Sequence, residues 1–583
     1  MNPAAYLVCV ILFLGTVAGL GVVVPLPRFL DPLERMTVVP AMGLVLIFLA
    51  AFFVYVLGLS WTWLDLAPIL AAAGLWWRRR EVTALLCDPG VRPAVLAWAL
   101  VAAWTQGLLA LVQNYSGAAW GGDWLEHHHR TRFFLQHWPL DYVFIGFYRL
   151  TARPPLANVV TAAFETLNRG SLPCDQVVLC LWSSLVFFPA ALIYRRCGGP
   201  LRRLPVLAVL LMLNPSFVQN STFAWTKLPA AFFVLAGAYF LFTALDERSS
   251  SGQFALAVGL LAAGILVHYS AAPYALVLAV LWIWRRAVVE RGAGLAREAA
   301  IGMAVATPLL GVWFAWALVH YGWAGTFLTN STVLDTGPAT FRGEIGKIAF
   351  NIWNTFVPHP LHPVDYGLIK QAELLAWFRD YFFLINQVTL PAMIGTGGLV
   401  ALTAALLRDW PVWRRQPGVC GPLPVLITLA GCVFLGIAVV GSWDEWGVAH
   451  ICLQAVDVFC LAALAARIDR IGRIGGAILV VGLLWDGAVN VGLHYYLQAQ
   501  TARPEWYTPP NWIAVTEKYG PAAFNAWLKH LVGVRFLHDG FVPAGLTAVV
   551  LAGLLAGAIG RAILSLREGR AAPAAATPGP VNR

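Results

Sequence analysis

Long apolar runs dominate this chain and follow one another along most of its 583 residues. Each run is roughly 15 to 22 residues long, which is the length that a helix needs to cross the hydrocarbon core of a bilayer. Of all residues, 59% are hydrophobic and 12% are charged, whereas soluble domains carry about 25% charged residues. A water-soluble chain of this length has no interior large enough for so much apolar surface. We therefore expect an all-α polytopic membrane protein.

Arginine clusters between the runs predict how the helices are oriented. Under the positive-inside rule, clusters such as Arg78 to Arg80, Arg195-Arg196 and Arg285-Arg286 mark cytoplasmic loops. This pattern predicts about fifteen spans (roughly 13 to 15), with the N-terminus outside and the C-terminus inside. The net charge of +10 comes with these clusters and does not indicate a nucleic-acid partner. The predicted spans are 5–25, 38–59, 62–77, 94–113, 177–194, 204–218, 227–245, 254–267, 272–284, 299–320, 388–407, 421–441, 446–466, 475–496 and 541–562.

Loop lengths divide the chain into regions and indicate which side of the membrane carries the function. The orientation leaves three long segments on the outer side, whereas the predicted inner loops are short, so we expect recognition or chemistry outside. The predicted regions are accessory helices at 1–93, a catalytic core at 94–320 with the outer loop 114–176, an outer capping loop at 321–387, carboxy-terminal helices at 388–566 with the outer loop 497–540, and a disordered tail at 567–583.

The first outer segment begins with a dense group of polar residues just beyond a predicted span. Asp123 and Glu126 are followed by three histidines at 127–129. A carboxylate beside the lipid boundary is costly unless it is paired or functional. A helix N-cap is the simpler alternative for Asp123. Adjacent histidines on a helix point in different directions, so a polar helix face is favoured over a metal site.

The same segment predicts a membrane-surface helix that starts at Leu125. An amphipathic helix of this kind lies in the interface with its apolar face in lipid. We expect residues 133–135, Phe-Phe-Leu, to enter the lipid. Arg130 and Arg132 should then face headgroups or a phosphate.

Further polar residues fall on the same predicted side. Arg153 precedes a Pro-Pro pair, which holds the backbone extended. Lys227 opens an apolar helix, where the free N–H groups of the helix start favour an anionic partner. Snorkelling to the interface is the alternative for both cations. The remaining residues of this set interrupt or flank apolar runs, and they are His268, Tyr269, Glu445 and His450.

This layout resembles the GT-C class of membrane glycosyltransferases. More narrowly, it is similar to the bacterial relatives of protein O-mannosyltransferases and of the lipid A aminoarabinose transferase (ArnT-like enzymes). The resemblance runs from about residue 94 to 320 and is carried by the acidic first loop with its surface helix and by the turn Arg153-Pro-Pro-Leu156. Three features depart from the family pattern. The first three predicted spans precede the usual start of its core, and its frequent Asp-Glu pair is absent from the first loop. Lys227 stands where many relatives have an acidic residue.

The resemblance implies an enzyme of the bacterial inner membrane that moves a sugar from a polyprenyl-phosphate donor to a glycan, lipid or protein acceptor on the periplasmic or extracellular side. Together with the residue chemistry it predicts direct, inverting transfer with Asp123 as base, and leaves a divalent ion (Mg²⁺ or Mn²⁺) open as a cofactor. The predicted site comprises the carboxylates Asp123 and Glu126, the donor-phosphate ligands Lys227, Arg153, Arg130, His268 and Tyr269, and the acceptor or supporting residues Glu445, His450 and His128.

Two other functions are compatible with a chain of this kind. An O-antigen polymerase or ligase would use a polyprenyl-pyrophosphate glycan, but such proteins concentrate their active residues in one large late loop. A transporter or flippase for lipid-linked sugars would show internal repeats and polar groups at the middle of the membrane. Here the most distinctive motif lies in the first loop and the polar residues gather at one face.

Overall fold

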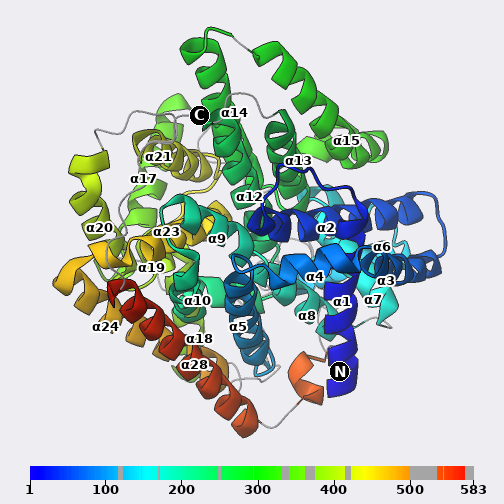
Figure 1. Ribbon diagram of the computed structural model, residues 1–583. Coiled ribbons are helices and arrows are strands. Elements are labelled where there is room, and N and C mark those ends of the chain that lie inside the picture. The colour runs from blue at the N-terminus through cyan, green and yellow to red at the C-terminus, as the bar shows by residue number, and fades with distance from the viewer. Residues whose placement is uncertain are drawn as a thin grey trace.

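Helices account for nearly all regular structure in this protein. A computed structural model describes residues 1–113, 115, 123–145, 148–168, 171–246, 251–292, 294–330, 340–361, 374–413, 422–497, 535–541 and 544–571. Within these ranges the elements are helical, apart from an isolated bridge between Phe144 and Tyr148 (Figure 1). The all-α prediction is confirmed for this part of the chain. Most of the predicted outer loop 497–540, and residues 572–583 of the predicted tail, lie outside the described residues.

The amino-terminal helices pack against the core and against one another. They are α1 (Pro3–Val23), α2 (Pro32–Val56), α3 (Leu66–Trp77) and α4 (Arg79–Cys87). Helix α2 starts with a capping box, in which Asp31 accepts from the N–H of Glu34 and Glu34 accepts from the N–H of Asp31. Such a cap satisfies two backbone donors that the first turn leaves free.

The central group of helices forms the most deeply buried part of the molecule. In the most apolar 18-residue stretch of Leu172–Arg196 all residues are buried, and in that of Lys227–Asp246 94% are. In that of Leu295–Phe327 only 11% are, so this helix lies at the edge of the group. The group comprises α5 (Arg92–Leu109), α6 (Asp123–Gln136), α7 (Leu156–Leu167), α8 (Leu172–Ser184), α9 (Phe187–Arg196), α10 (Leu204–Leu213), α11 (Pro215–Thr222), α12 (Lys227–Asp246), α13 (Ser251–Val267), α14 (Ala271–Trp284) and α15 (Leu295–Phe327).

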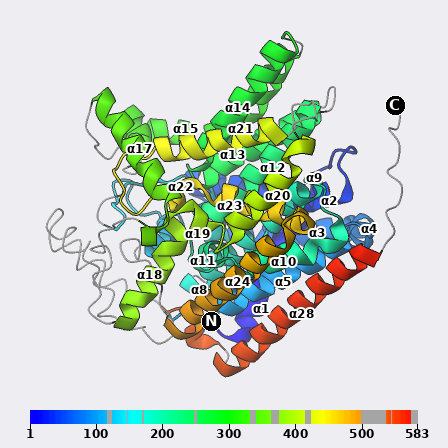
Figure 2. The same cartoon turned by 90° about the vertical axis from the view of Figure 1, so that its left-hand side faces the viewer.

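The carboxy-terminal helices cover one flank of this group, and the last of them runs along α5 and α10 (Figure 2). They are α17 (Phe341–Phe356), α18 (Leu374–Val388), α19 (Leu390–Met393), α20 (Gly398–Trp413), α21 (Pro422–Ala438), α22 (Ala449–Cys452), α23 (Gln454–Ala466), α24 (Gly472–Val491) and α28 (Ala544–Ala571).

Among the described residues, eight helices are long and apolar enough to cross a membrane, or ten if two bent pairs count as one span each. The predicted number of about fifteen membrane spans is therefore not confirmed by the lengths of these helices. Several predicted spans are broken. The predicted span 204–218 turns by 70° at Asn214-Pro215, where the Asn214 side chain caps α11 by accepting from the N–H of Phe217. The predicted spans 388–407 and 446–466 are likewise divided between shorter helices.

The arginine clusters gather at one end of the helices and are largely matched by acidic residues there. Arg195 pairs with Asp31 at 2.7 Å and Arg286 pairs with Glu298 at 2.7 Å, while Arg196 pairs with Asp246 at the end of α12. Helix α12 has 20 residues, so its first residue, Lys227, is about 30 Å from this end. That is the thickness of the hydrocarbon core.

The apolar face of α6 is covered by protein. Phe133 and Phe134 are fully buried, and the Phe134 ring packs edge-on against Tyr55 of α2 with 5.0 Å between centroids. The prediction that these rings enter lipid is therefore wrong, because α2 and α7 lie where the bilayer was expected. The helix itself is confirmed, since α6 runs from Asp123 to Gln136.

Small residues let α1 pack closely against α2. A Cβ atom added at Gly21 would lie 2.0 Å from the carbonyl oxygen of Val39, whereas one added at Gly15 of the same helix would meet nothing within 4 Å. Close backbone approach at small residues is a common way for membrane helices to associate.

Replacing Gly21 by alanine is therefore expected to separate the two helices and lower the thermal unfolding temperature in mild detergent. The matched variant Gly15→Ala should leave that temperature unchanged or raise it slightly, because alanine favours a helix by about 0.5 to 1 kcal/mol over glycine. Equal unfolding temperatures for the two variants would contradict the close packing.

Candidate functional site

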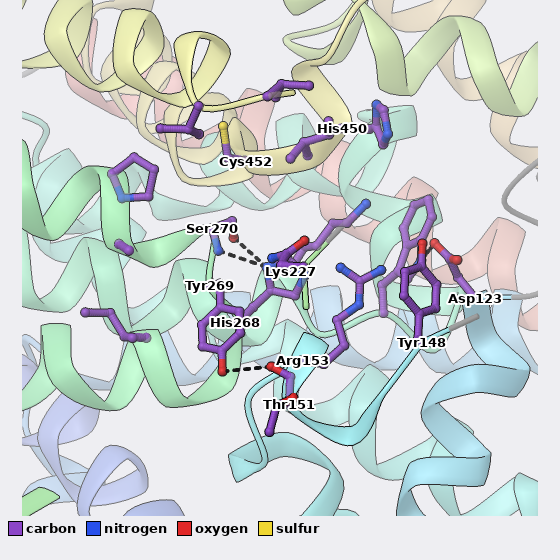
Figure 3. A pocket seen from close by; sticks show the side chains of 18 of the residues that line it. Asp123, Tyr148, Thr151, Arg153, Lys227, His268, Tyr269, Ser270, His450 and Cys452 are labelled. Carbon is purple, nitrogen blue, oxygen red and sulfur yellow. Dashed lines mark hydrogen bonds between the residues drawn. The ribbon is translucent and has the colours of Figure 1, made fainter. Parts of the chain in front are cut away.

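A cavity of about 610 Å³ opens where the ends of several helices meet, at the opposite end from the arginine clusters. Its polar residues come from the start of α6, the segment before α7, the start of α12, the α13–α14 junction and residues 442–450 (Figure 3). One wall is apolar. The charged and imidazole side chains that line it are Asp123, His127, Arg153, Lys227, His268, Asp444 and His450, and the apolar wall includes Ile265, Pro273, Phe314, Phe327, Val439, Val440 and Ile451.

Asp123 is the first residue of α6 and lines the cavity. Its Oδ2 accepts a hydrogen bond of 3.1 Å from the indole N–H of Trp225. Burial raises the pKa of the Asp123 carboxyl above its ordinary value, while Arg153 and Lys227 offset part of the rise. A carboxylate with a raised pKa accepts a proton more readily at neutral pH.

Arg153 is held in the cavity wall by the backbone around it. The short helix η3 (Leu150–Ala152) ends just before it, and Arg153 is extended with φ −130° and ψ 143°, as expected for a residue before proline. Its guanidinium lies 5.1 Å from the centroid of the Tyr148 ring, and its Nε lies 3.6 Å from the carboxylate of Glu126. Burial opposes ionisation, but Glu126 holds the pKa of Arg153 above its ordinary value, so it stays charged.

Glu126 and Arg130 form a buried pair behind the cavity. The Arg130 Nε donates to Glu126 Oε1 at 2.7 Å, and its two terminal nitrogens donate to the carbonyl oxygens of Leu150 and Arg149 at 2.6 and 2.9 Å. Burial alone would raise the pKa of Glu126, yet Arg130 and Arg153 hold it below the ordinary value. The expectation that Arg130 faces a phosphate is not met, because protein atoms take up its donors. Glu126 also lies outside the cavity lining and positions Arg153.

Lys227 opens α12 and its side chain is largely buried in the cavity. The ammonium nitrogen lies 3.8 Å from the centroid of the Trp225 ring, a cation–π contact that partly compensates for lost hydration. Within the described part of the chain, no carboxylate forms an ion pair with Lys227. Figure 3 shows Lys227 and Arg153 between His268 on one side and Tyr148 and Asp123 on the other.

His268 offers the cavity an uncharged donor. Burial, with Arg153 and Lys227 nearby, holds the pKa of His268 well below its ordinary value, so the ring is neutral. Its Nδ1 lies 3.1 Å from the backbone N–H of Ser270, which can only donate. Nδ1 is therefore the acceptor, and the ring proton resides on Nε2.

Tyr269 contributes its ring, whereas its hydroxyl is already bound by the protein. The hydroxyl donates to the carbonyl oxygen of Thr151 at 3.2 Å and accepts from the indole N–H of Trp313 at 3.2 Å. Burial raises the pKa of Tyr269 to about 12. The residue links the α13–α14 junction to the segment before Arg153.

Asp444, rather than Glu445, lines the cavity. Its Oδ1 accepts from the backbone N–H groups of Trp446 and Gly447 at 2.9 and 3.2 Å, in a turn completed by Gly447 at φ +99°. Burial raises the pKa of Asp444 to about 6. Glu445 is exposed outside the cavity, which corrects its predicted place in the site. An aspartate three residues before a glycine is a turn signature that favours Asp444.

Of the three adjacent histidines, His127 lines the cavity, whereas His128 and His129 do not. His127 Nδ1 lies 3.2 Å from Asn158 Oδ1, and burial lowers its pKa to about 4, so it is neutral there. The prediction named His128 and omitted His127. The helical turn that places Asp123 in the cavity also brings the residue four positions later to the same face. That spacing would have identified His127.

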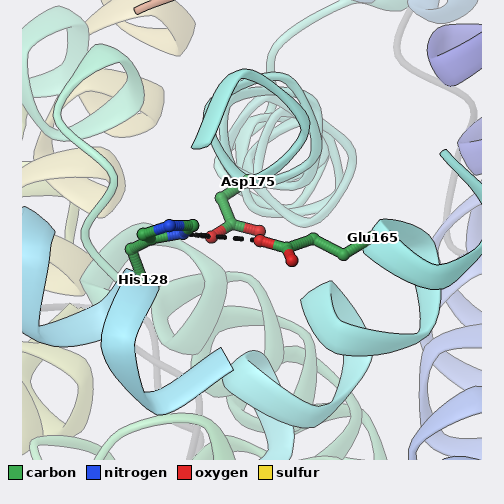
Figure 4. Close-up of side chains that lie close together, drawn as sticks. All are labelled: His128, Glu165 and Asp175. Carbon is green, nitrogen blue, oxygen red and sulfur yellow. Dashed lines mark hydrogen bonds and ion pairs between the residues drawn. The ribbon is translucent and has the colours of Figure 1, made fainter. Parts of the chain in front are cut away.

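His128 joins a separate buried cluster with Glu165 of α7 and Asp175 of α8 (Figure 4). Its Nδ1 lies 2.6 Å from Asp175 and 3.4 Å from Glu165, and Arg132 lies 3.3 Å from the other oxygen of Glu165. Burial opposes protonation of His128, but the two carboxylates raise its pKa to about 9. The separation of 2.6 Å between His128 and Asp175 is typical of a charge-assisted hydrogen bond, and Arg132 supplies a second cation beside Glu165. The cluster therefore fits an ion pair better than a metal site.

Helix α17, from the predicted capping loop, holds residues 442–448 over the cavity. Asn351 donates to the carbonyl oxygen of Ser442 at 2.9 Å, and Asn354 donates to that of Asp444 at 3.0 Å. Thr355 accepts from the N–H of Val448 at 3.0 Å. His450 lies just beyond, buried in the cavity wall, where burial holds its pKa well below the ordinary value.

No protein-family model matches this chain, and no curated protein matches it. Two solved chains match, both of ArnT from Cupriavidus metallidurans. The one bound to undecaprenyl phosphate has 16% identity and a TM-score of 0.45, with 81% of this chain and 76% of that chain covered. The apo form has 17% identity and a TM-score of 0.31, with 69% and 76% covered. Both TM-scores are below 0.5, which is too low to assign a function to this chain.

Replacing Glu126 by glutamine is expected to destabilise the protein by about 3 to 5 kcal/mol, because it leaves the buried Arg130 charge without a counter-ion. The exposed pair of Arg78 with Glu81 supplies a control, since Glu81→Gln should change stability by no more than about 0.5 kcal/mol. Chemical unfolding in mild detergent measures both. Similar losses for the two variants would contradict the assigned role of Glu126.

The ion pair of His128 predicts a pH-dependent contribution to stability. The pKa of His128 is about 9 in the folded protein and 6.5 in an unfolded chain. Its contribution is therefore fully present below pH 6.5 and is lost as the pH rises through about 9. The difference in unfolding temperature between wild type and His128→Gln should shrink over this interval. A difference that stays constant over this interval would refute the ion pair.

Proposed function

We propose that this protein is a membrane glycosyltransferase of GT-C type that uses a polyprenyl-phosphate-linked sugar. The observation that carries the proposal is the position of Lys227 and Arg153 in one cavity with the carboxylate of Asp123 and an apolar wall. Transfer of a sugar from a lipid phosphate needs cations for the leaving phosphate, a base for the acceptor hydroxyl and an apolar surface for the lipid. These groups supply all three.

The donor phosphate would bind between Lys227, Arg153 and the Nε2–H of His268. Lys227 has no carboxylate partner among the described residues, so it gains a counter-charge when an anion enters. The neutral His268 adds a directed hydrogen bond without adding charge. The isoprenoid chain would leave along the apolar wall, toward helices α14 and α15, whose spans are only 28% and 11% buried and so face lipid.

The reaction would then proceed as a direct displacement. The acceptor hydroxyl gives its proton to Asp123 while its oxygen bonds to the anomeric carbon. The bond between that carbon and the phosphate oxygen breaks, and the electron pair leaves with the polyprenyl phosphate. Attack opposite the leaving group inverts the anomeric centre. Lys227 and Arg153 stabilise the negative charge that develops on the phosphate.

His127, Asp444 and His450 line the rest of the cavity and would bind the sugar and the acceptor. A glycan, a lipid or a protein can supply the acceptor hydroxyl. A divalent ion such as Mg²⁺ or Mn²⁺ is the alternative source of positive charge for the phosphate, with Asp123 and Asp444 as its carboxylate ligands. Because the cavity is opposite the arginine-rich end, we place it on the periplasmic or extracellular face of a bacterial inner membrane.

Sugar transfer by the purified protein in lipid nanodiscs tests this proposal, with a panel of labelled polyprenyl-phosphate sugars and added membrane extract as acceptor. Asp123→Asn should lower the rate by about 10²-fold to 10⁴-fold through loss of the base. Lys227→Gln should lower it by about 10²-fold to 10³-fold through loss of phosphate stabilisation. An arm with a chelator shows whether a divalent ion takes part.

Asp141→Asn and Lys347→Gln are the matched controls, because Asp141 is exposed on the same outer segment and Lys347 pairs with Glu344 at 2.5 Å outside the cavity. Both should retain the wild-type rate. If the Asp123 and Lys227 variants were as active as these controls, the assigned roles would be wrong. Movement of labelled donor across proteoliposomes without transfer would instead identify a flippase.

A further inference from the structure

A second large groove lies at the end of the helices opposite the cavity. It has a volume of about 750 Å³ and is formed by the start of α5, the start of α10 and the last turns of α28. Figures 1 and 2 show these three helices side by side. Arg92 of α5, Arg202 just before α10 and Arg561 of α28 line it together with Glu568. The proposed transfer reaction uses none of these residues.

The three groove arginines have no counter-ion among the described residues, unlike Arg203 and Arg195. Arg203, adjacent to Arg202, pairs with Asp469, and Arg195 pairs with Asp31. Within the described residues, Arg92, Arg202 and Arg561 form no ion pair, and all three are exposed. Glu568 is the single carboxylate in the groove lining, so three positive charges face one negative charge.

The rest of the groove is apolar. Leu96 and Leu100 extend the lining along α5, and Leu564 extends it along α28. The outward faces of α28 are lipid-facing, since only 22% of its apolar span is buried. A headgroup site that continues into an apolar channel matches a lipid rather than a small aqueous anion.

We infer that this groove binds an anionic phospholipid, with its phosphate held by Arg92, Arg202 and Arg561 and an acyl chain lying along Leu96, Leu100 and Leu564. Guanidinium groups bind phosphate oxygens through paired, charge-assisted hydrogen bonds. Basic pockets between helices on the cytoplasmic side are a recognised setting for anionic headgroups. A zwitterionic lipid carries its own cationic group, which the three arginines would repel, so an anionic lipid fits the groove better. The bound lipid would join α28 to α5 and α10.

Native mass spectrometry of the full-length protein in detergent tests the inference, with dioleoyl phosphatidylglycerol and dioleoyl phosphatidylcholine as probes. Wild-type protein should retain phosphatidylglycerol in preference to phosphatidylcholine. Each arginine near the headgroup contributes roughly fivefold in affinity, so replacing all three by glutamine should weaken phosphatidylglycerol binding on the order of a hundredfold. Replacing all three by lysine keeps the charge but not the paired hydrogen bonds, so binding should be weaker than in wild type and stronger than in the glutamine variant. Glu568→Gln should tighten it.

A control triple variant, Arg28, Arg80 and Arg297 to glutamine, removes the same charge from exposed arginines outside the groove. It should bind phosphatidylglycerol as wild type does, and matching unfolding temperatures show that the variants are folded. Equal retention of the two lipids by wild type would overturn the inference. So would equal losses in the groove and control variants.

Discussion

A buried charge is costly unless it is paired, and Glu126 pairs with two buried arginines beside the cavity, Arg130 and Arg153. Its carboxylate lies 2.7 Å from Arg130 and 3.6 Å from Arg153. Arg130 in turn binds the carbonyl oxygens of Leu150 and Arg149, which fixes the segment that leads into the Pro-Pro turn. Glu126 therefore orients α6, which begins at Asp123, relative to Arg153 in the cavity wall. The cost of an unpaired buried charge makes this arrangement a condition of folding.

Much of this architecture can be predicted from the sequence, because a bilayer requires long apolar helices and favours arginines at one side. Apolar length predicts helices, and the arginine clusters do gather at one end, opposite the cavity. The Pro-Pro turn predicted the extended backbone at Arg153, and a cation at the start of an apolar helix singled out Lys227. Asp123, Arg153, Lys227, His268, Tyr269 and His450, chosen from separate segments, all line one cavity. Side-chain polarity beside long apolar runs is costly, so it points reliably to shared sites.

Sequence reasoning failed where neighbouring residues point in different directions or where protein replaces lipid. His127 and His128 are adjacent, yet one faces the cavity and the other pairs with Asp175. Asp444 and Glu445 are also adjacent, yet only Asp444 lines the cavity. The sequence around Phe133 and Phe134 is compatible both with rings that enter lipid and with rings that pack against other helices. Hydrophobicity alone does not distinguish these two surroundings. The breaks at Asn214-Pro215 and near Leu453 depend on which backbone groups find partners, which only tertiary structure decides.

The apolar wall of the cavity has a kinetic consequence. It is built from residues of α13, α14, α15 and α22 and from the two valines that follow α21. Most residues in the apolar stretches of α14 and α15 are not buried inside the protein. The proposed lipid-linked donor would therefore arrive by lateral diffusion in two dimensions and would never have to leave the bilayer. Its effective concentration is a mole fraction among lipids, not an aqueous molarity. Turnover at a fixed amount of substrate would then fall as inert lipid is added, as in surface-dilution kinetics.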